Sequence, residues 1–117
     1  MSEAMKLAQL EAPVQRVLGA GLVDTVDVAR VLETTQRSVQ RWQAQDTAPR
    51  KDAEDRLLEL ASVLDLAKRT MPAEGARLWL RTPIEALGWY KPLDAVKDGR
   101  YREVIDALLA LSEGVIQ

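Results

Sequence analysis

The feature that most constrains the fold is an apolar stripe along residues 52–69 at helical spacing. Its members recur every three or four positions, and further apolar residues widen it: Leu57, Leu60, Ala61, Leu64 and Ala67, with Leu58, Val63 and Leu66 beside them. A stripe this broad is typical of a helix that is covered on more than one side. Because full burial of a leucine contributes about 1.5 to 3 kcal/mol, we expect this helix to be the central column and to carry much of the stability.

The composition also favours helices, because Ala and Leu dominate the 117 residues and Phe is absent. A chain of this length can bury roughly two-thirds of its unfolded surface, which is enough for one domain with a real core. We therefore predict an all-α, compact multi-helix fold in one globular unit. Residues 1–50 carry N-terminal helices, including a helix-turn-helix at about residues 24–43, and residues 51–117 carry the long helix and a C-terminal helical region. The pattern of residues 1–12 is weak.

The N-terminal helices follow from capping and spacing. Pro13 fits the first position of a helix at residues 13–19, and Asp24 can cap the first helix of the helix-turn-helix. Residues 33–35 end that helix, and Glu33 occupies the turn position that Gly often takes. The sides of the two helices that would face each other carry apolar residues at helical spacing. These are Val28, Ala29 and Leu32 on the first helix, and Val39 and Trp42 on the second.

The second of these helices would present polar and basic side chains outward. The candidate DNA contacts are Gln36, Arg37, Ser38, Gln40 and Arg41, followed by Arg50 and Lys51. Arg can bond to guanine or phosphate, Gln to adenine and Ser to either. Residues 36–51 hold four basic residues against one acid, whereas the whole chain has a net charge of −2. The alternative is an ordinary solvated helix face, because helix-turn-helix folds often persist after DNA contact is lost.

Residues 79–101 hold closely spaced cap and turn signals. Thr82 and Glu85 can form a capping box around Pro83, and Pro92 can open a further short helix that Gly99 ends. We expect these connectors to join a helix at residues 73–80 to a last helix at residues 100–112, which Gly114 stops. The expected inner faces are Ala76, Trp79 and Leu80, and then Tyr101, Val104, Ile105, Leu108, Leu109 and Leu111.

The composition excludes most catalytic chemistry. Without Cys and His, the chain has no disulfide framework, no thiolate metal site and no imidazole base. No carboxylate pair lies on an evident cleft element, so we expect no enzyme, no cofactor and no metal. No apolar run reaches the ~20 residues of a membrane span, and the first residues lack the pattern of a signal peptide. We therefore expect a cytoplasmic protein without membrane association.

Proline and glycine anchors in fixed order give the C-terminal part a family resemblance. The anchors are Trp79-Leu80, Thr82-Pro83, Leu87-Gly88, Lys91-Pro92-Leu93-Asp94, Val96-Lys97-Asp98-Gly99, Val104, Leu108 and Glu113-Gly114-Val115. This order resembles the C-terminal toxin-binding domain of the Xre/MbcA/ParS antitoxins, and residues 37–42 resemble the helix-turn-helix of the same family. Together the two segments cover about residues 20–117. One departure is Ile84, where family members often carry Asn.

The resemblance implies a bacterial type II antitoxin whose partner is a RES-domain toxin, a cytoplasmic enzyme that consumes NAD. In such complexes the C-terminal region of the antitoxin lies across the substrate cleft of the toxin, and the helix-turn-helix can bind promoter DNA of the operon. A single short helix-turn-helix gives little DNA affinity alone, so we expect a homodimer or a hetero-oligomer with the toxin. An alternative without a toxin partner is a stand-alone helix-turn-helix transcriptional regulator.

The candidate toxin contacts combine an aromatic pair with the C-terminal segment: Trp89, Tyr90, Lys91, Arg100, Glu113, Gly114, Val115, Ile116 and Gln117. A cleft that binds a dinucleotide pyrophosphate should be basic, so Glu113 can mimic an anionic group while Val115 and Ile116 fill apolar space. The connectors at residues 79–101 would set the angle at which the last helix carries this segment. A frayed chain end is the alternative for the same residues.

Overall fold

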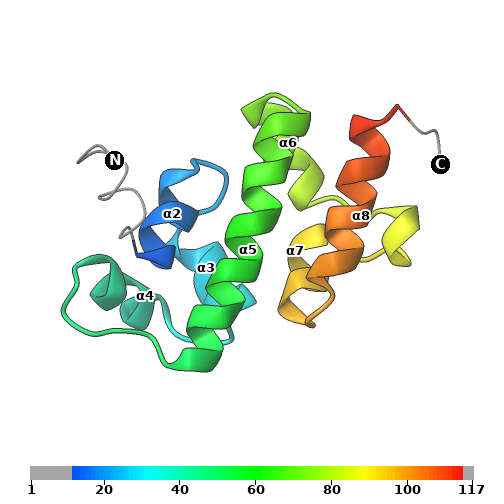
Figure 1. Ribbon diagram of the computed structural model, residues 1–117. Helices are drawn as coiled ribbons and strands as arrows, with labels where there is room; N and C mark the ends of the chain where they lie inside the picture. Colours follow the sequence, from blue (N-terminus) through cyan, green and yellow to red (C-terminus); the bar gives the residue numbers. More distant parts are fainter. Residues whose placement is uncertain (1–11, 115–117) are drawn as a thin grey trace.

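The computed structural model describes residues 12–114, and they form helices around the long helix α5 (Lys51–Thr70) (Figure 1). Among residues 12–114, three helices precede it, namely α2 (Pro13–Gly19), α3 (Thr25–Val31) and α4 (Gln36–Gln43). Four elements follow it, namely α6 (Ala73–Leu80), the short 3-10 helix η1 (Glu85–Leu87), α7 (Pro92–Lys97) and α8 (Tyr101–Ser112). The described residues contain no β-strand beyond an isolated bridge between Ile84 and Tyr90. The predicted all-α fold class is confirmed.

Helix α5 is the central column, with α2 packed along one side and α8 along the other (Figure 1). The predicted stripe is fully buried at Leu57, Leu60, Ala61, Val63, Leu64 and Ala67. Leu66 is half-buried, and the prediction for Leu58 is wrong because 40% of its surface is exposed. One position turns a helix by about 100°, so the side chain after buried Leu57 points away from the covered sides. None of the helices in residues 12–114 is long and apolar enough to cross a membrane.

The two short helices predicted within residues 24–43 form as α3 and α4. Asp24 caps α3 as expected, and the cap is a reciprocal box with Asp27. Val28, Ala29 and Val39 are buried between the helices and the core, while Leu32 and Trp42 are half-buried. The turn between them places Glu33 at φ 55°, the left-handed region that costs a side-chain residue about 1 to 2 kcal/mol. The turn thus has the geometry that glycine favours, and this chain builds it with glutamate.

The capping box predicted for Thr82 and Glu85 is wrong. The Thr82 hydroxyl donates instead to the carbonyl of Leu78 at 2.6 Å, which ties it back to α6. Ile84 occupies the position before η1 and has no side-chain capping bond. A residue before proline is pushed towards extended backbone, so Thr82 and Pro83 continue away from α6 rather than starting an α-helix. Residues 84–90 then form a small hairpin, in which the Trp89 N–H donates to the Ile84 carbonyl at 2.8 Å.

The last two helices follow the sequence prediction more closely. Pro92 opens α7, and Gly99 takes φ 83° at its end. Helix α8 buries Val104 and Leu108, with Tyr101 and Ile105 half-buried. The prediction fails for Leu109 and Leu111, which are 42% and 45% exposed. Leu109 is turned by about 100° from Leu108, and no described element covers Leu111 in the last turn.

The contrast along α5 gives a stability test. We expect Leu64→Ala to lower the free energy of unfolding by about 2 to 5 kcal/mol, because it removes a fully buried side chain from a packed core. Leu58→Ala on the same helix is the control and should cost much less, because Leu58 is already partly in water. Urea unfolding followed by circular dichroism measures both. Equal losses for the two variants would contradict the central role of the buried stripe.

Candidate functional site

Trp89 is an exposed aromatic side chain on strained backbone. Two-thirds of its surface (66%) is accessible, and its φ is 67°, in the left-handed region. Gly88 before it has the same φ of 67°, and the Tyr90 N–H donates to the Leu87 carbonyl at 3.3 Å to close the turn. Left-handed backbone is easy for glycine but costs energy for tryptophan. A large apolar side chain held outward at such a cost is typical of a contact site.

Arg100 fastens this hairpin to the start of α8. Its guanidinium lies 4.8 Å from the centre of the Tyr90 ring and donates to the Leu87 carbonyl at 3.2 Å. It also makes two bonds to the Glu103 carboxylate, at 2.8 and 3.0 Å. The bond to Glu103 raises the pKa of Arg100, and the same bond lowers the pKa of Glu103. Arg100 therefore holds the hairpin in place while Trp89 and Tyr90 remain accessible.

The structure divides the predicted toxin contacts into two groups. Trp89, Tyr90, Lys91 and Arg100 form one continuous area, which we call the hairpin surface. Glu113 and Gly114 are exposed at the other end of α8, roughly 20 Å along the helix from Arg100 at 1.5 Å per residue. Gly114 takes φ 72° and ends the helix there. Val115, Ile116 and Gln117 lie outside the described residues.

The candidate DNA contacts lie on and just after α4. Gln36, Arg37, Gln40 and Arg41 are exposed along this helix, and Arg50 is exposed before α5. Three of the seven candidates have partners within this half of the chain: the Gln36 side chain donates to the Thr25 hydroxyl at 2.9 Å, Lys51 pairs with Asp55 at 3.5 Å, and Ser38 bonds to Thr35.

Ser38 is half-buried and belongs to the cap of α4 rather than to its outer face. Its backbone N–H donates to the Thr35 hydroxyl oxygen at 3.1 Å, and its own hydroxyl accepts from the same Thr35 hydroxyl at 3.0 Å. Arg37 and Arg41 form no ion pair with any residue in the range 12–114. Of the predicted residues on α4, Arg37, Gln40 and Arg41 are therefore the best presented.

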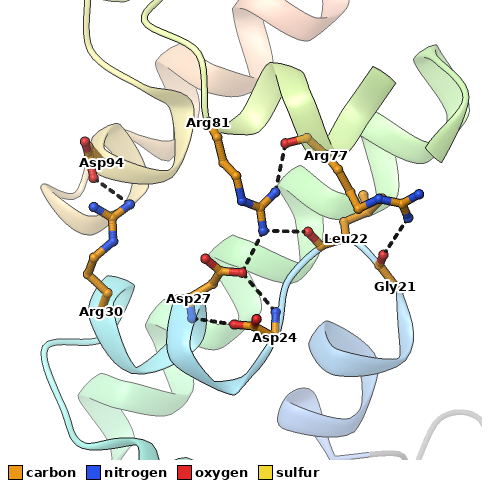
Figure 2. Close-up of polar contacts among 8 residues, drawn as sticks. All are labelled: Gly21, Leu22, Asp24, Asp27, Arg30, Arg77, Arg81 and Asp94. Atoms are coloured by element: carbon orange, nitrogen blue, oxygen red, sulfur yellow. Dashed lines mark hydrogen bonds and ion pairs between the residues drawn. The ribbon is translucent and has the colours of Figure 1, made fainter. Parts of the chain in front are cut away.

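Arg81 joins the C-terminal half of the chain to the cap of α3 (Figure 2). Its guanidinium donates to the carboxylate of Asp27 at 2.6 Å, to the Leu22 carbonyl at 3.1 Å and to the Arg77 carbonyl at 2.8 Å. The same Asp27 oxygen also accepts the Asp24 N–H at 3.0 Å. One side chain thus links the end of α6 to the residues that start α3. We call this set of contacts the arginine clamp.

Two further arginines reinforce the arginine clamp from either side (Figure 2). Arg77 donates to the Gly21 carbonyl at 3.0 Å, and Arg30 on α3 pairs with Asp94 on α7 at 3.0 Å. Sequence reasoning missed these contacts, because their partners are more than fifty residues apart in the chain. The helix cap at Asp24 was the one local sequence signal in this part of the structure. Among residues 12–114, no group of His, Cys, Asp or Glu is arranged to hold a metal ion.

Comparison with known proteins identifies the class to which this fold and these surfaces belong. The mycobacterial cidal antitoxin MbcA of Mycobacterium tuberculosis is 36% identical over 89 residues, which span 76% of this chain and 79% of MbcA. A probable mycobacterial cidal antitoxin of the same organism, Rv3188, is 29% identical over 92 residues, or 79% of this chain and 78% of the relative. No family model matches the sequence.

A solved structure agrees with the sequence comparison. A chain in the crystal structure of the M. tuberculosis MbcT-MbcA toxin-antitoxin complex superposes with a TM-score of 0.81 at 32% identity. The match covers 92% of this chain and 99% of that one. The relatives named here are antitoxins, and MbcA was crystallised in complex with the toxin MbcT. The chain belongs to the MbcA family of antitoxins.

The cap of α3 gives a pH prediction. The Asp27 backbone N–H donates to the Asp24 carboxylate and lowers the pKa of Asp24 below its ordinary value of 3.8, with a smaller contribution from the charge of Arg81. A lowered pKa adds stability that is present above the ordinary value and is lost as pH falls through the folded-state pKa. We therefore expect the free energy of unfolding to decrease below about pH 4.

The matched variant is Asp24→Asn, because asparagine caps a helix about as well but does not titrate. Urea unfolding at about pH 6 and about pH 3 should show a smaller acid loss for Asp24→Asn than for the wild type. Other carboxylates titrate equally in both proteins, so the difference between the two isolates Asp24. Identical acid losses would contradict the role of the cap.

Proposed function

We propose that this antitoxin neutralises a cognate RES-type, NAD-degrading toxin by covering the active-site cleft of the toxin with its C-terminal region. Membership of the MbcA family supports a toxin partner, and the MbcT-MbcA complex is an example from a relative. The observation that carries the proposal is Trp89, exposed on the hairpin that Arg100 contacts. Tryptophan is among the residues that most often dominate binding energy at protein interfaces.

The hairpin surface and the end of α8 would have separate tasks. Arg100 contacts the Leu87 carbonyl and the Tyr90 ring, so these side chains should lose less conformational freedom when a partner binds. Glu113 stands exposed at the end of α8 and can enter a cleft that is basic because it binds a pyrophosphate. In this proposal the hairpin supplies affinity, while residues 113–117 occupy the cleft. NAD is a cytoplasmic substrate, so we place the complex in the cytoplasm.

Two variants separate binding from inhibition. Trp89→Asn should weaken toxin binding by about tenfold or more, because an interface tryptophan often contributes over 1.4 kcal/mol. Asparagine tolerates left-handed backbone, so the turn should persist. Deletion of residues 114–117 should leave binding largely intact but restore NAD consumption by the toxin. Calorimetry and an NAD assay measure the two effects in the same samples.

The control is Leu78→Asn, which changes an equally exposed apolar residue on α6 (71% exposed). It should bind and inhibit like the wild type. If the deletion variant inhibits as well as the full chain, residues 114–117 do not cover the cleft. If Trp89→Asn binds normally, the hairpin surface is not the toxin contact.

A second candidate function is autoregulation through promoter DNA, and the exposed face of α4 favours it. Arg37, Gln40 and Arg41 are outward on a helix that follows a tight turn, as in helix-turn-helix proteins. Helices α4 and α8 lie on opposite sides of α5 (Figure 1), so DNA and toxin need not compete for the same surface. One such unit gives little affinity alone, so we propose a homodimer or a toxin-linked oligomer on half-sites about one helical turn apart.

The DNA proposal is tested by salt-dependent binding to the upstream promoter. Arg37→Ala and Arg41→Ala should each weaken binding and lower the slope of log K against log salt by about one, because each removes a phosphate contact. Arg69→Ala is the matched control, since Arg69 is an exposed arginine at the far end of α5. Absence of binding by the wild-type chain, with and without toxin, would exclude this function.

A further inference from the structure

A small groove lies between η1 and α8, beside the hairpin surface. Its lining is three alanines and two acids, namely Ala86, Ala107, Ala110, Glu103 and Asp106. We call it the alanine groove. Its volume is about 320 Å³, near the lower end of the range for small-molecule sites, and it is open to solvent. A groove of this size and openness suits one side chain of a partner better than an enclosed small ligand.

The helical register of α8 explains the shape of the groove. Glu103 and Ala107 are four residues apart, as are Asp106 and Ala110, so the two pairs run along one side of the helix. The alanine side chains end at the methyl group, and Ala86 faces them from η1. No side chain of the described residues fills the space, and the acids form its polar edge.

The two acids of the groove differ in whether a basic side chain already pairs with them. Glu103 is held by Arg100 through two bonds, at 2.8 and 3.0 Å. Asp106 is exposed and forms no ion pair with any residue in the range 12–114. The groove therefore offers methyl groups along its length and one available carboxylate at its edge. Lysine and arginine match this pattern, because each has an apolar stem and a cationic head.

The alanine groove is continuous with the hairpin surface through Arg100. This side chain binds the Leu87 carbonyl, next to Ala86, and also binds Glu103 on the edge of the groove. It stacks on Tyr90 at the same time, at 4.8 Å. A partner that contacts Trp89 and Tyr90 would therefore reach the groove without crossing another element.

We propose that the alanine groove receives a lysine or arginine side chain of the toxin, which pairs with Asp106. This inference rests on the proposed toxin binding by the hairpin surface. The charge argument supports the same occupant, because a cleft that binds the pyrophosphate of NAD needs basic residues, and an antitoxin over its rim would meet them. The groove thus adds specificity for the charge of the partner to the affinity supplied by Trp89.

The test uses the full chain and its cognate toxin. Asp106→Lys places a positive charge at the edge of the groove, and Ala110→Leu fills the groove with a residue that is a good helix former. Each variant should weaken toxin binding by about tenfold or more, measured by calorimetry, because like charge or overlap is introduced at a contact. Asp106→Asn should lie between the wild type and Asp106→Lys, and its binding should depend less on salt.

Two controls match the changes in charge and in volume. Asp46→Lys reverses an exposed acid in the loop after α4, and Ser62→Leu adds the same side chain at an exposed site on α5. Both should bind the toxin like the wild type, and thermal melts should show that every variant is folded. Ala110→Leu in particular keeps a helix-forming residue at a half-buried site.

The outcomes separate this inference from the proposed function. If the wild type binds the toxin but Asp106→Lys and Ala110→Leu bind equally well, the groove is not a contact and the inference is wrong. If only Ala110→Leu loses affinity, the groove is occupied by an apolar group and the proposed cation is wrong. If the wild type itself does not bind the toxin, the proposed function fails and this inference fails with it.

Discussion

The burial of α5 on several sides is the constraint on which the rest of the structure depends. Its apolar stripe is too broad for one neighbour, so α2 must cover one side and α8 the other. This requirement fixes α8, and α8 in turn carries Arg100, which holds the hairpin surface. It also separates α4 from α8, which lie on opposite sides of α5 (Figure 1). The placement of both surfaces thus follows from one hydrophobic requirement.

Polar contacts define the relative orientation of α3 and α6 where they meet, because apolar packing is not directional. In the arginine clamp, Arg81 donates to the Asp27 carboxylate in the cap of α3, to the Leu22 carbonyl before that cap and to the Arg77 carbonyl on α6. A guanidinium has several donors in a rigid plane, so it can join three such acceptors at once. The Arg81–Asp27 ion pair is only partly buried, so solvent still screens its charges. Its effect is on geometry, because it sets how the start of α3 lies against the end of α6.

Most of the helices could be predicted from the sequence, because their signals are local. The stripe of α5, the cap at Asp24 and the glycine after α7 each depend on residues within a few positions of one another. The capping box predicted at Thr82 was wrong because the Thr82 hydroxyl could cap the next helix or bond back to α6, and it bonds back to α6. The burial predicted for Leu58, Leu109 and Leu111 was wrong. Helical spacing predicts which face of a helix is apolar, but it does not predict how much of that face a neighbouring element covers.

The candidate site was predictable only in part, for the same reason. The sequence could nominate Trp89 and Tyr90 as exposed, since Gly88 and Pro92 flank them in a connector. It could not show that Arg100 reaches back to Leu87 and Tyr90, or that Ala86 faces Ala107 and Ala110. These are contacts between elements, and they depend on how α8 is placed against η1. The contacts of the arginine clamp could not be predicted for the same reason, because they also join separate elements.

The arginine clamp has a consequence for how such a protein can be rearranged. The cap of α3 receives a donor from Arg81, which lies beyond α5 and α6 in the chain. A chimera that took residues 1–50 from this antitoxin and the remainder from an unrelated protein would leave Asp27 without its cation and the buried side of α2 without α5. The two surfaces are therefore not interchangeable modules. Changes to either candidate surface are therefore expected to be tolerated as substitutions within the intact chain rather than as exchanged halves.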